Sequence, residues 1–559
     1  MTGNQQLTNA FLCAQANDTI TIHAGTYNLA TEEMTFRYET DEDGTLHPTA
    51  GTCLYSRADS LTVQGDPAAV REDIVLSGLG ANAASADGQH AILRLEGANA
   101  TVRHLTFVKG LANHNAIVYR NGVQQNTDKW VFRRGGGLFL KNGGVAEDCT
   151  FDSCYAGQGA CVYGGLRLSN CTFRNSNAVA SNSGCAVCDA KSVTGSLFEG
   201  NKRGALRGCS VGASNCVFKA NGNAGSTGLL WYHTGALVDC AFSNNTTTCV
   251  YLHGANTPSE ITRCTFSKNA DPAYAAGIGG PNACTTSVRD CTFVGNLQVS
   301  NVTAKVSGCT FVSGNGRLLD GCPDVEDSTF TGEGVTVTGS TDANVTAIRS
   351  CGFRRCVFKG LSLHWAYGFE NVHTMENCLV TETVQWGTGA LFAHTDGLDA
   401  TYLNCTVVSN GSLNTMYVNT AKAGTVTFRN SLFWMNRVGG QAWNRNDFWV
   451  SSADDLAQLK MDYCLFSAGG SFGSVEVAGE HSTNQAYHDP RLKIVAKPNE
   501  IHGDPYALYR KSPFVNVGDN GDWTEDDTDL AGKPRLNGTV DLGCYENWDP
   551  APGSLFLIR

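Results

Sequence analysis

The chain lacks the long apolar stretches that mark membrane proteins. No run approaches the roughly 18 apolar residues that a membrane-spanning helix needs. The first residues, MTGNQQLTNAF, lack the basic stretch and apolar core of a signal peptide. We therefore expect no transmembrane segment in this sequence.

Charge is also scarce, and what is present is mainly negative. Asp, Glu, Lys and Arg make up 16% of the 559 residues, against roughly 25% in an average soluble domain. The formal net charge is −12. Since contacts to phosphates dominate the affinity of proteins for nucleic acid, an anionic chain is a poor candidate for that partner. We expect none.

Glycine, by contrast, is abundant, with 63 residues against a usual share of roughly 7%. Ser, Thr and Asn accompany it throughout. These residues favour tight turns between short strands.

One short pattern, usually Cys-Thr-Phe, recurs along most of the chain. Its copies begin at Cys149, Cys171, Ser196, Cys216, Cys240, Cys264, Cys291, Cys309, Ser328, Cys356, Cys378, Cys405, Ser431 and Cys464. Self-similarity at a period of about 20–30 residues indicates stacked structural units. The first and third residues of each copy share one face of a strand, since side chains alternate along a strand.

The repeat predicts an all-β fold, a single-stranded right-handed parallel β-helix. A coil of short strands cannot bury its own inner face, so coils must stack at about 4.8 Å. Cys and Phe would then fill the core. The Asn that often follows, at Asn175, Asn201, Asn221, Asn245 and Asn269, could form hydrogen-bonded ladders along the stack.

Most of the 23 cysteines are therefore expected to be core side chains. A disulfide remains possible outside the pattern, as between Cys13 and Cys53. Cys185 and Cys188 are three apart on a strand, so we expect them to point to opposite faces, with no metal or redox role.

Open stacks expose sheet edges, so both ends need covers. Leu7, Ala10, Phe11 and Ala14 have the spacing of an amphipathic helix. We predict an N-terminal cap and first coil over residues 1–57, the β-helix over 58–470, and a C-terminal capping segment over 471–559. Together these form one continuous domain.

Both ends of the chain resemble a known family. Asp18-Thr-Ile-Thr-Ile22 and Gly25-Thr-Tyr27 resemble the opening of secreted bacterial parallel β-helix proteins. Asp489-Pro490, Ser512-Pro513, Asp529 to Arg535 and Asp541 to Glu546 resemble their closing segment, of the choice-of-anchor type. The repeats are similar to those of chlamydial polymorphic membrane proteins and pectate-lyase-like proteins. The resemblance implies a secreted or cell-surface monomer whose native signal is absent from this sequence. It does not single out one activity.

A second line of residues precedes a turn in many coils. We expect it to face outward, with Leu230, Tyr232, Leu252, Ala393 and Val418 facing inward. The outward line comprises Asp189, Arg207, Trp231, His233, Tyr251, His253, Asp320, Phe392, His394, Tyr417 and Asn419. Sugar rings stack on aromatic faces, and their hydroxyl groups need polar partners. The line therefore predicts a polysaccharide-binding groove, with Trp231, Tyr251, Phe392, His394, Tyr417, Asn419 and Trp443 as binding residues.

Chemistry on this line could take two forms. His233 and His253, expected about 5 Å apart on adjacent coils, could act as acid and base. Arg207 could neutralise a carboxylate, which together indicates a polysaccharide lyase. A glycoside hydrolase needs two carboxylates, for which Asp189 and Asp320 are candidates, although no pair is convincing by spacing.

Other interpretations stay open. The same line could hold a glycan without cleaving it, as in a surface adhesin. A trimeric phage-type spike is less favoured because of the closing segment. Asp320, Asp324, Glu326 and Asp327 could bind calcium, although a solvated acidic turn is the simpler interpretation. Insertions around Trp130 and Trp443 could wall the groove or cover exposed core.

Overall fold

The structure is a computed structural model, in which the chain forms two compact units, Met1–Thr286 (unit 1) and Ser287–Arg559 (unit 2). We describe each unit by itself. The described residues are 4–29, 38–40, 46–48, 52–78, 91–112, 118–120, 123–125, 134–141, 143–178, 185–222, 228–253, 257–269, 277–295, 299–312, 318–332, 348–364, 367–386, 390–411, 414–418, 424–436, 446–450, 459–466, 471–472, 475–476, 481–484, 489–496, 503–521 and 523–548.

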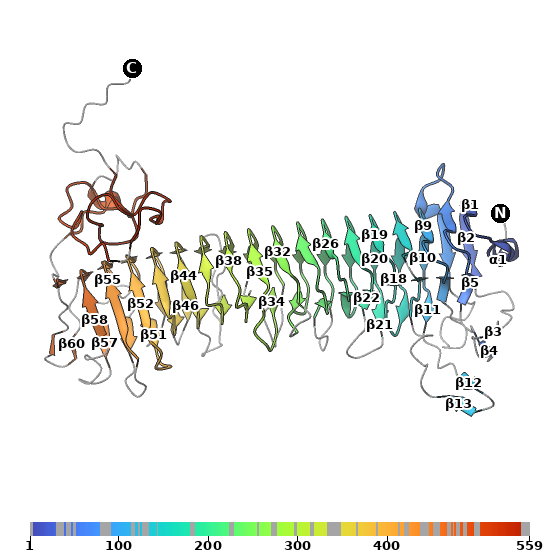
Figure 1. The fold of residues 1–559 in the computed structure, drawn as a ribbon, viewed down its shortest axis with the longest axis horizontal. Helices are drawn as coiled ribbons and strands as arrows, with labels where there is room; N and C mark the ends of the chain where they lie inside the picture. Colours follow the sequence, from blue (N-terminus) through green and yellow to red (C-terminus); the bar gives the residue numbers. More distant parts are fainter. Residues whose placement is uncertain are drawn as a thin grey trace, which may run out of the picture. The chain divides into compact units, whose positions relative to one another are not determined.

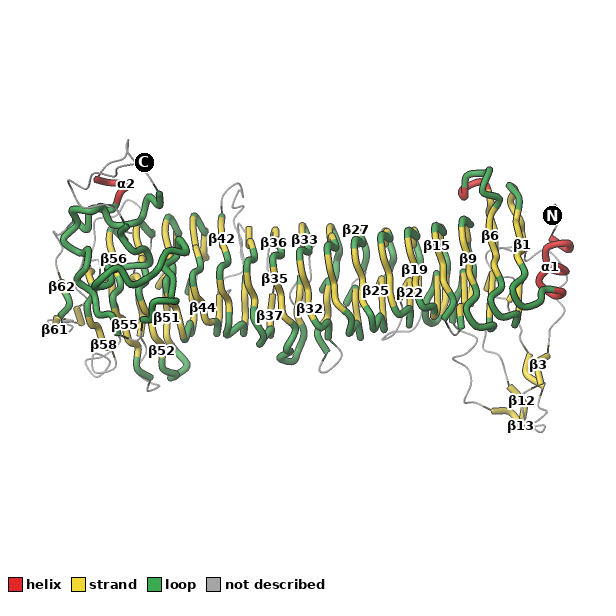
Figure 2. The backbone as a smooth tube through the Cα atoms, turned by 45° about the horizontal axis from the view of Figure 1, so that its top comes forward, coloured by secondary structure: helices red, strands yellow, loops and turns green. Residues whose placement is uncertain are grey.

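The predicted fold is confirmed: the chain is a right-handed parallel β-helix (Figures 1 and 2). Each coil contributes one short strand to each of three parallel sheets. The predicted limits of the caps, at residues 57 and 470, and the single continuous domain stay predictions.

The strands of unit 1 run in parallel register through its coils. Sheet 1 contains β1 (Thr19–Ile22), β6 (Thr62–Gly65), β9 (Thr101–Arg103), β15 (Val145–Glu147), β19 (Arg167–Ser169), β23 (Ser192–Thr194), β26 (Gly212–Ser214), β29 (Ala236–Val238) and β32 (Glu260–Thr262). Sheet 2 contains β2 (Gly25–Asn28), β7 (Ile74–Ser77), β10 (Thr106–Val108), β16 (Thr150–Asp152), β20 (Thr172–Arg174), β24 (Leu197–Glu199), β27 (Val217–Lys219), β30 (Ala241–Ser243) and β33 (Thr265–Ser267). Sheet 3 contains β5 (Thr52–Ser56), β8 (Ala91–Leu95), β14 (Leu138–Leu140), β18 (Val162–Gly164), β22 (Cys185–Cys188), β25 (Gly204–Arg207), β28 (Leu230–Trp231), β31 (Val250–Tyr251) and β34 (Ile278–Gly279).

Unit 2 repeats this arrangement. Its sheet 1 contains β35 (Ser287–Arg289), β38 (Val306–Ser307), β41 (Val325–Glu326), β44 (Gly352–Arg354), β48 (Thr374–Glu376), β52 (Ala400–Leu403), β55 (Val426–Arg429) and β58 (Leu459–Asp462). Its sheet 2 contains β36 (Thr292–Val294), β39 (Thr310–Val312), β42 (Thr329–Thr331), β45 (Val357–Lys359), β49 (Leu379–Thr381), β53 (Thr406–Val408), β56 (Leu432–Trp434), β59 (Leu465–Phe466) and β62 (Thr483–Asn484). Its sheet 3 contains β37 (Val299–Ser300), β40 (Leu319–Asp320), β43 (Ile348–Arg349), β47 (Phe369–Glu370), β51 (Ala390–His394), β54 (Asn414–Val418) and β57 (Asn446–Val450).

Smaller elements lie beside the coils. The antiparallel pairs are β3 (Tyr38–Thr40) with β4 (Leu46–Pro48), β12 (Val118–Arg120) with β13 (Val123–Gln125), and β60 (Ser471–Phe472) with β61 (Val475–Glu476). Additional parallel strands are β11 (Leu111–Ala112), β17 (Tyr155–Ala156) and β21 (Asn177–Ala178), and β46 (Ser362–His364) with β50 (Val384–Trp386). A 3-10 turn spans Arg71–Asp73, and α2 spans Lys493–Ala496.

The predicted N-terminal helix is present as α1 (Asn4–Cys13). Its Leu7 and Phe11 are buried, as their spacing predicted. The helix packs against β5, beside the first strands of the stack (Figure 1).

Residues with a left-handed backbone turn the chain at the corners of the coils. Asp148, Asn170 and Asp239 have φ near +50° between sheets 1 and 2. Asn, Asp and Gly tolerate this conformation, whereas other residues lose about 1–2 kcal/mol there. The Cys of the repeat follows directly, and its thiol donates to the carbonyl two residues before, as Cys149 does to Glu147 at 3.3 Å.

The inward Phe and Cys residues form the core, as predicted. Phe107, Phe151, Phe173, Phe198, Phe218, Phe242 and Phe266 stack ring on ring in unit 1, with centroids 4.7–5.4 Å apart. In unit 2 the stack contains Phe293, Phe311, Phe330 and Phe358. Each buried Phe contributes about 1.5–3 kcal/mol. The repeat cysteines beside them are buried too.

The predicted asparagine ladder exists, with one correction. Asn201, Asn221, Asn245 and Asn269 are buried, and each side-chain amide donates to the Phe carbonyl of the coil before, as Asn221 does to Phe198 at 2.9 Å. Asn175 is not a member. It has φ +55° and lies at the exposed corner, so Ser176 ends the ladder instead, against Asn201.

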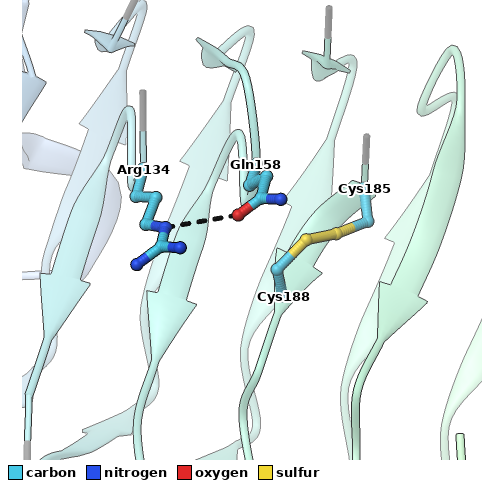
Figure 3. Close-up of a disulfide and its surroundings, with 4 residues drawn as sticks. All are labelled: Arg134, Gln158, Cys185 and Cys188. Carbon is cyan, nitrogen blue, oxygen red and sulfur yellow. Dashed lines mark hydrogen bonds between the residues drawn. A yellow bond between two sulfur atoms is a disulfide. The ribbon is translucent and has the colours of Figure 1, made fainter. Parts of the chain in front are cut away.

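Two cysteine predictions are wrong. Cys13 and Cys53 are free thiols. Cys185 and Cys188 form a disulfide, with Cα atoms 6.1 Å apart. Although three residues separate them on β22, the strand brings the two side chains together (Figure 3).

The C-terminal segment of unit 2 lies against the outer face of sheet 2. Its Leu508, Phe514 and Leu542 pack on Leu379 and Leu432, which would otherwise be exposed. Corner asparagines hold its backbone: Asn377 donates to Thr528, Asn404 to Asp541 and Asn430 to Asp519. That the segment also closes the end of the stack stays a prediction.

The residues that carried the family resemblance are the buried charges of this segment. Asp529, Arg535, Asp541 and Glu546 are all buried. The carboxylates accept backbone N–H groups, and Arg535 donates to the carbonyls of Asp541 and Gly543. Burial raises the pKa of Asp541 to about 6 and that of Glu546 to about 8. No helix of the described part of the chain is long and apolar enough to cross a membrane.

Replacement of Asn221 by Ala should destabilise unit 1. The change removes the acceptor of the Asn201 backbone N–H and the donor to the Phe198 carbonyl, and each orphaned buried group costs about 1–3 kcal/mol. Asn175→Gly is the matched control, since it keeps the left-handed corner and removes only an exposed contact. Denaturant unfolding of both variants measures this, and equal midpoints would contradict the ladder's role.

The C-terminal segment should loosen as the pH rises. Because Asp541 and Glu546 have folded pKa values above their unfolded ones, their stabilising contribution is complete at acid pH and is lost through about pH 6 and about pH 8. Hydrogen exchange of residues 503–548, corrected for intrinsic rate, should accelerate toward alkaline pH. In Glu546→Gln the upper part of this rise should disappear; an unchanged profile would refute the assignment.

Candidate functional site

A continuous line of outward side chains follows sheet 3 of unit 1. Strand pairing places its members on adjacent coils in the order Arg94, Phe139, Tyr163, Cys188, Arg207 and Trp231, and Tyr251 follows Trp231. We call these residues the sheet 3 column. The alternate positions, such as Leu138, Leu206 and Leu230, are buried inside.

At its N-terminal end the column alternates guanidinium groups and rings. Arg94 lies over the Phe139 ring at 4.0 Å, and Phe139 stacks on Tyr163 with centroids 5.6 Å apart. Arg134 covers Tyr163 at 4.6 Å and donates to Gln158 (Figure 3). Such cation–π contacts fix the planes of the rings.

Tyr163 and Asp189 form an acid–base pair next to the column. Asp189 is exposed at a left-handed corner, φ +58°, directly after Cys188. Burial and a hydrogen bond to the Asp189 carboxylate raise the pKa of Tyr163 to about 12. A Cβ at Gly208 would come within 2.5 Å of Asp189 Oδ1, so only glycine leaves room for the carboxylate there.

Three side chains with rings, those of Tyr232, Trp231 and His253, gather near Arg207. Its guanidinium carbon is 5.3 Å from the Tyr232 ring centroid, which is 4.9 Å from the ring of Trp231 and 5.2 Å from that of His253. His253 also meets the edge of Trp231. Tyr232, Trp231 and His253 are each partly exposed, so a ligand on the surface could contact this cluster.

The prediction that His233 faces outward is wrong. Its side chain is 1% exposed and lies in the core, where burial lowers its pKa to about 4. The cause is the corner at Tyr232, which has φ +51°. This residue turns the chain so that Tyr232 faces outward and His233 inward. Leu252 has no such conformation, so Leu252 is buried and His253 faces outward.

The outward assignment also fails for Phe392 and His394 in unit 2. Phe392 is fully buried on Phe369, with centroids 4.7 Å apart. His394 is 5% exposed, contacts Tyr402 Oη at 2.9 Å, and burial lowers its pKa to about 4. Strand pairing matches Tyr417 with Ala393 rather than with Phe392, one residue away from the predicted alignment. Tyr251 lies on the outward face but is only 8% exposed.

Asp320 lies in unit 2, partly exposed on β40, where strand pairing sets it beside Ser300 and Arg349. The nearby acidic turn is neutralised by basic groups: Lys305 bonds Glu326 at 2.8 Å, and Arg355 bonds Asp327 at 2.7 Å. Within the described ranges, no group of three His, Cys, Asp or Glu side chains could hold a metal ion.

Some predicted residues fall outside what the structure describes. These are Asn419, Trp443 and Trp130, together with the side chain of Tyr417. Their proposed roles stay predictions.

Sequence reasoning missed Arg94, Phe139, Tyr163 and Tyr232. A signal for Tyr163 was present, because Cys161-Val-Tyr163 repeats the Cys249-Val-Tyr251 that was recognised. The corner at Tyr232 also had a signal in the sequence, which lies in other coils. Gly208-Cys209, Gly321-Cys322 and Ser350-Cys351 follow the same rule as the Cys-Thr-Phe corners, a left-handed residue before an inward one.

The column thus offers aromatic faces, guanidinium groups, an exposed carboxylate and one partly exposed imidazole. These groups can stack on sugar rings, neutralise negative charge and donate or accept hydrogen bonds. His253, Asp189 and Arg207 are the groups of the predicted set that the structure leaves in reach of a surface ligand in unit 1.

Comparison with solved structures returns other proteins at low similarity. A PL6 alginate lyase in complex with a trisaccharide is 11% identical, with a TM-score of 0.27, over 86% of this chain and 93% of that one. The catalytic domain of a GH87 α-1,3-glucanase is 11% identical, TM-score 0.22, over 80% and 66%. PfbA, a surface adhesin of Streptococcus pneumoniae, is 11% identical, TM-score 0.17, over 77% and 87%.

No family model matches the chain. No curated protein matches it either.

The orientation of the histidines gives a direct test of the site. Diethyl pyrocarbonate acylates accessible neutral imidazoles, so His253 should be modified at neutral pH while His233 and His394 stay protected. Mass spectrometry of the digested protein measures the modification. All three should react after denaturation, which serves as the control. Rapid labelling of His233 in the folded protein would show that it faces outward after all.

Proposed function

We propose that the protein binds a polysaccharide along the sheet 3 column of unit 1 and cleaves it there. The observation that carries this is the column itself, in which rings and guanidinium groups occupy the same outward position on most coils, interrupted by the buried Cys188 between Tyr163 and Arg207. Coils are spaced at about 4.8 Å, close to the length of one sugar unit. A glycan laid along the column would meet one side chain per sugar.

Cleavage would take place at the cluster around Arg207. His253 is the partly exposed imidazole that would act as general acid or base on the substrate. Arg207 would stabilise negative charge that develops on the substrate. The exposed Asp189 offers one carboxylate beside the same line, so the groups present support lyase chemistry more directly than glycoside hydrolase chemistry, which needs two carboxylates. His233 has no part in this reaction because it lies in the core.

A non-catalytic glycan-binding role, as in an adhesin, is the second candidate. Two observations favour it. The column extends over several coils beyond the cluster, as far as Arg94. Among the described residues of unit 1, Asp189 also has no second carboxylate on the column to complete a hydrolase pair.

A polysaccharide panel distinguishes these roles. The purified chain is incubated with acidic and neutral glycans, and both the ultraviolet absorbance of unsaturated products and new reducing ends are recorded. Both signals together indicate a lyase, and reducing ends alone indicate a hydrolase. Binding without either signal indicates the second candidate. His253→Ala should abolish cleavage and leave binding largely intact.

Trp231→Ala tests the surface itself. Loss of one stacking ring should weaken glycan binding about tenfold, since aromatic contacts of this kind contribute on the order of 1 kcal/mol or more. Trp548→Ala is the matched control, because Trp548 is an exposed tryptophan of the C-terminal segment in unit 2 and is not a member of the column. Equal affinities for the two variants, or no binding to any glycan, would refute the proposal.

A further inference from the structure

Arg207 of the sheet 3 column and Arg134 beside it differ from many other basic side chains on unit 1. Arg94, also in the column, donates to Glu96 at 2.7 Å. On sheets 1 and 2, several outward basic side chains pair with a carboxylate on a neighbouring coil: Arg167 with Glu147, Arg174 with Asp152 at 2.9 Å, and Lys219 with Glu199 at 2.8 Å. Most of these charges therefore cancel locally, although Arg103 donates to the neutral Gln64.

Arg134 and Arg207 break this rule. Neither has a carboxylate partner among the residues that the structure describes; Arg134 donates to the neutral Gln158, and Arg207 lies against Tyr232. Both are close enough to Tyr163 to lower its pKa against the larger effects of burial and Asp189, which raise it. Two cations and one carboxylate leave this stretch of the column net positive on a chain whose net charge is −12.

The cluster also lacks hydrogen-bond acceptors. Arg207 Nε and Trp231 Nε1 are buried donors with no partner among the described groups, and the two residues are paired in register on adjacent coils. Buried donors are usually satisfied, and these two differ from the unpaired Arg535 Nε and His233 nitrogens because their side chains are partly exposed. Both side chains lie against the Tyr232 ring, whose displacement would open them to a ligand oxygen.

We infer that the polysaccharide is acidic and that Arg207 with Trp231, and Arg134 beside Tyr163, are two subsites for its anionic groups. This inference rests on the proposed function and names the substrate class of the same site. A carboxylate fits the paired donors, because it presents two acceptor oxygens in one plane. A sulfate ester carries the same charge and is the alternative source that the experiment must distinguish.

The test compares one glycan in three forms: a uronate polysaccharide, the same chain after carboxyl reduction, and a sulfated neutral polysaccharide. The wild-type chain should prefer the uronate form about tenfold or more over the reduced form, and added salt should weaken only the acidic interaction. Arg207→Gln and Arg134→Gln should each remove much of this preference. The affinity for the uronate form should fall much further than the affinity for the reduced form.

Two controls keep the result specific. Arg167→Gln removes an outward arginine that is paired with Glu147, and it should retain the preference. Trp231→Phe keeps a ring but removes the donor, so it should lose preference for the acidic form and retain binding to the reduced one. Tighter binding of the sulfated glycan would assign the subsites to sulfate.

The two proposals can fail separately. Equal binding of the uronate and reduced forms overturns this inference and leaves the proposed function standing. If no polysaccharide binds, the proposed function fails, and glucuronate and inorganic sulfate are titrated directly against chain labelled with ¹⁵N-tryptophan. A shift of the Trp231 indole resonance that disappears in Arg207→Gln would support the anionic subsite, and its absence would overturn it.

Discussion

The left-handed residue at each corner is the constraint on which the coils depend. Between sheets 1 and 2 it stands directly before the inward Cys, as Asp148 stands before Cys149. A strand alone fixes only alternation, so the residue after a corner could face either way. The corner decides, because a single residue with positive φ resets the alternation and directs the next side chain into the core. Asn, Asp and Gly recur at these places because they adopt that conformation at low cost.

The same constraint explains which parts of the fold could be predicted from the sequence. Cys, Phe and the buried Asn repeat at fixed offsets, so their inward position follows from period and alternation alone. Asn175 shows the limit. Asn175 lies one residue before Ser176, which holds the ladder position of that coil against Asn201. Asn175 itself has the left-handed backbone of a corner, which distinguishes it from the ladder asparagines. The disulfide of Cys185 and Cys188 likewise depends on local geometry that spacing does not specify.

At the candidate site the prediction failed where a corner was hidden. Tyr232 is an unusual residue for positive φ, so its own identity did not mark it as a corner, and the alternation from Leu230 was carried through it to His233. Only the other coils, with Gly208, Gly321 and Ser350 at the same place, indicated the corner. In unit 2 the predicted alignment of β51 with β54 was wrong by one residue, since Phe392 aligns with Met416 and not with Tyr417. Residues before the corner, such as Arg207 and Trp231, were assigned to the correct face because no turn intervenes. A left-handed tyrosine is costly, and its place between Trp231 and His253 is the strained feature that a functional surface would retain.

In the C-terminal segment, the sequence indicated the motif but not the burial of its charged residues. Its motif was recognised from Asp529, Arg535, Asp541 and Glu546, yet charged residues are usually taken as exposed. In the structure they are buried and bonded mainly to backbone groups. Arg535 Nε and Nη1 and Glu546 Oε1 nevertheless have no partner among the described groups, as Arg207 Nε and Trp231 Nε1 have none. The two places differ in exposure. Arg535 is enclosed by the segment, whereas Arg207 and Trp231 are partly exposed side chains whose unpaired donors lie near the surface, and on this difference the proposed anionic subsite rests.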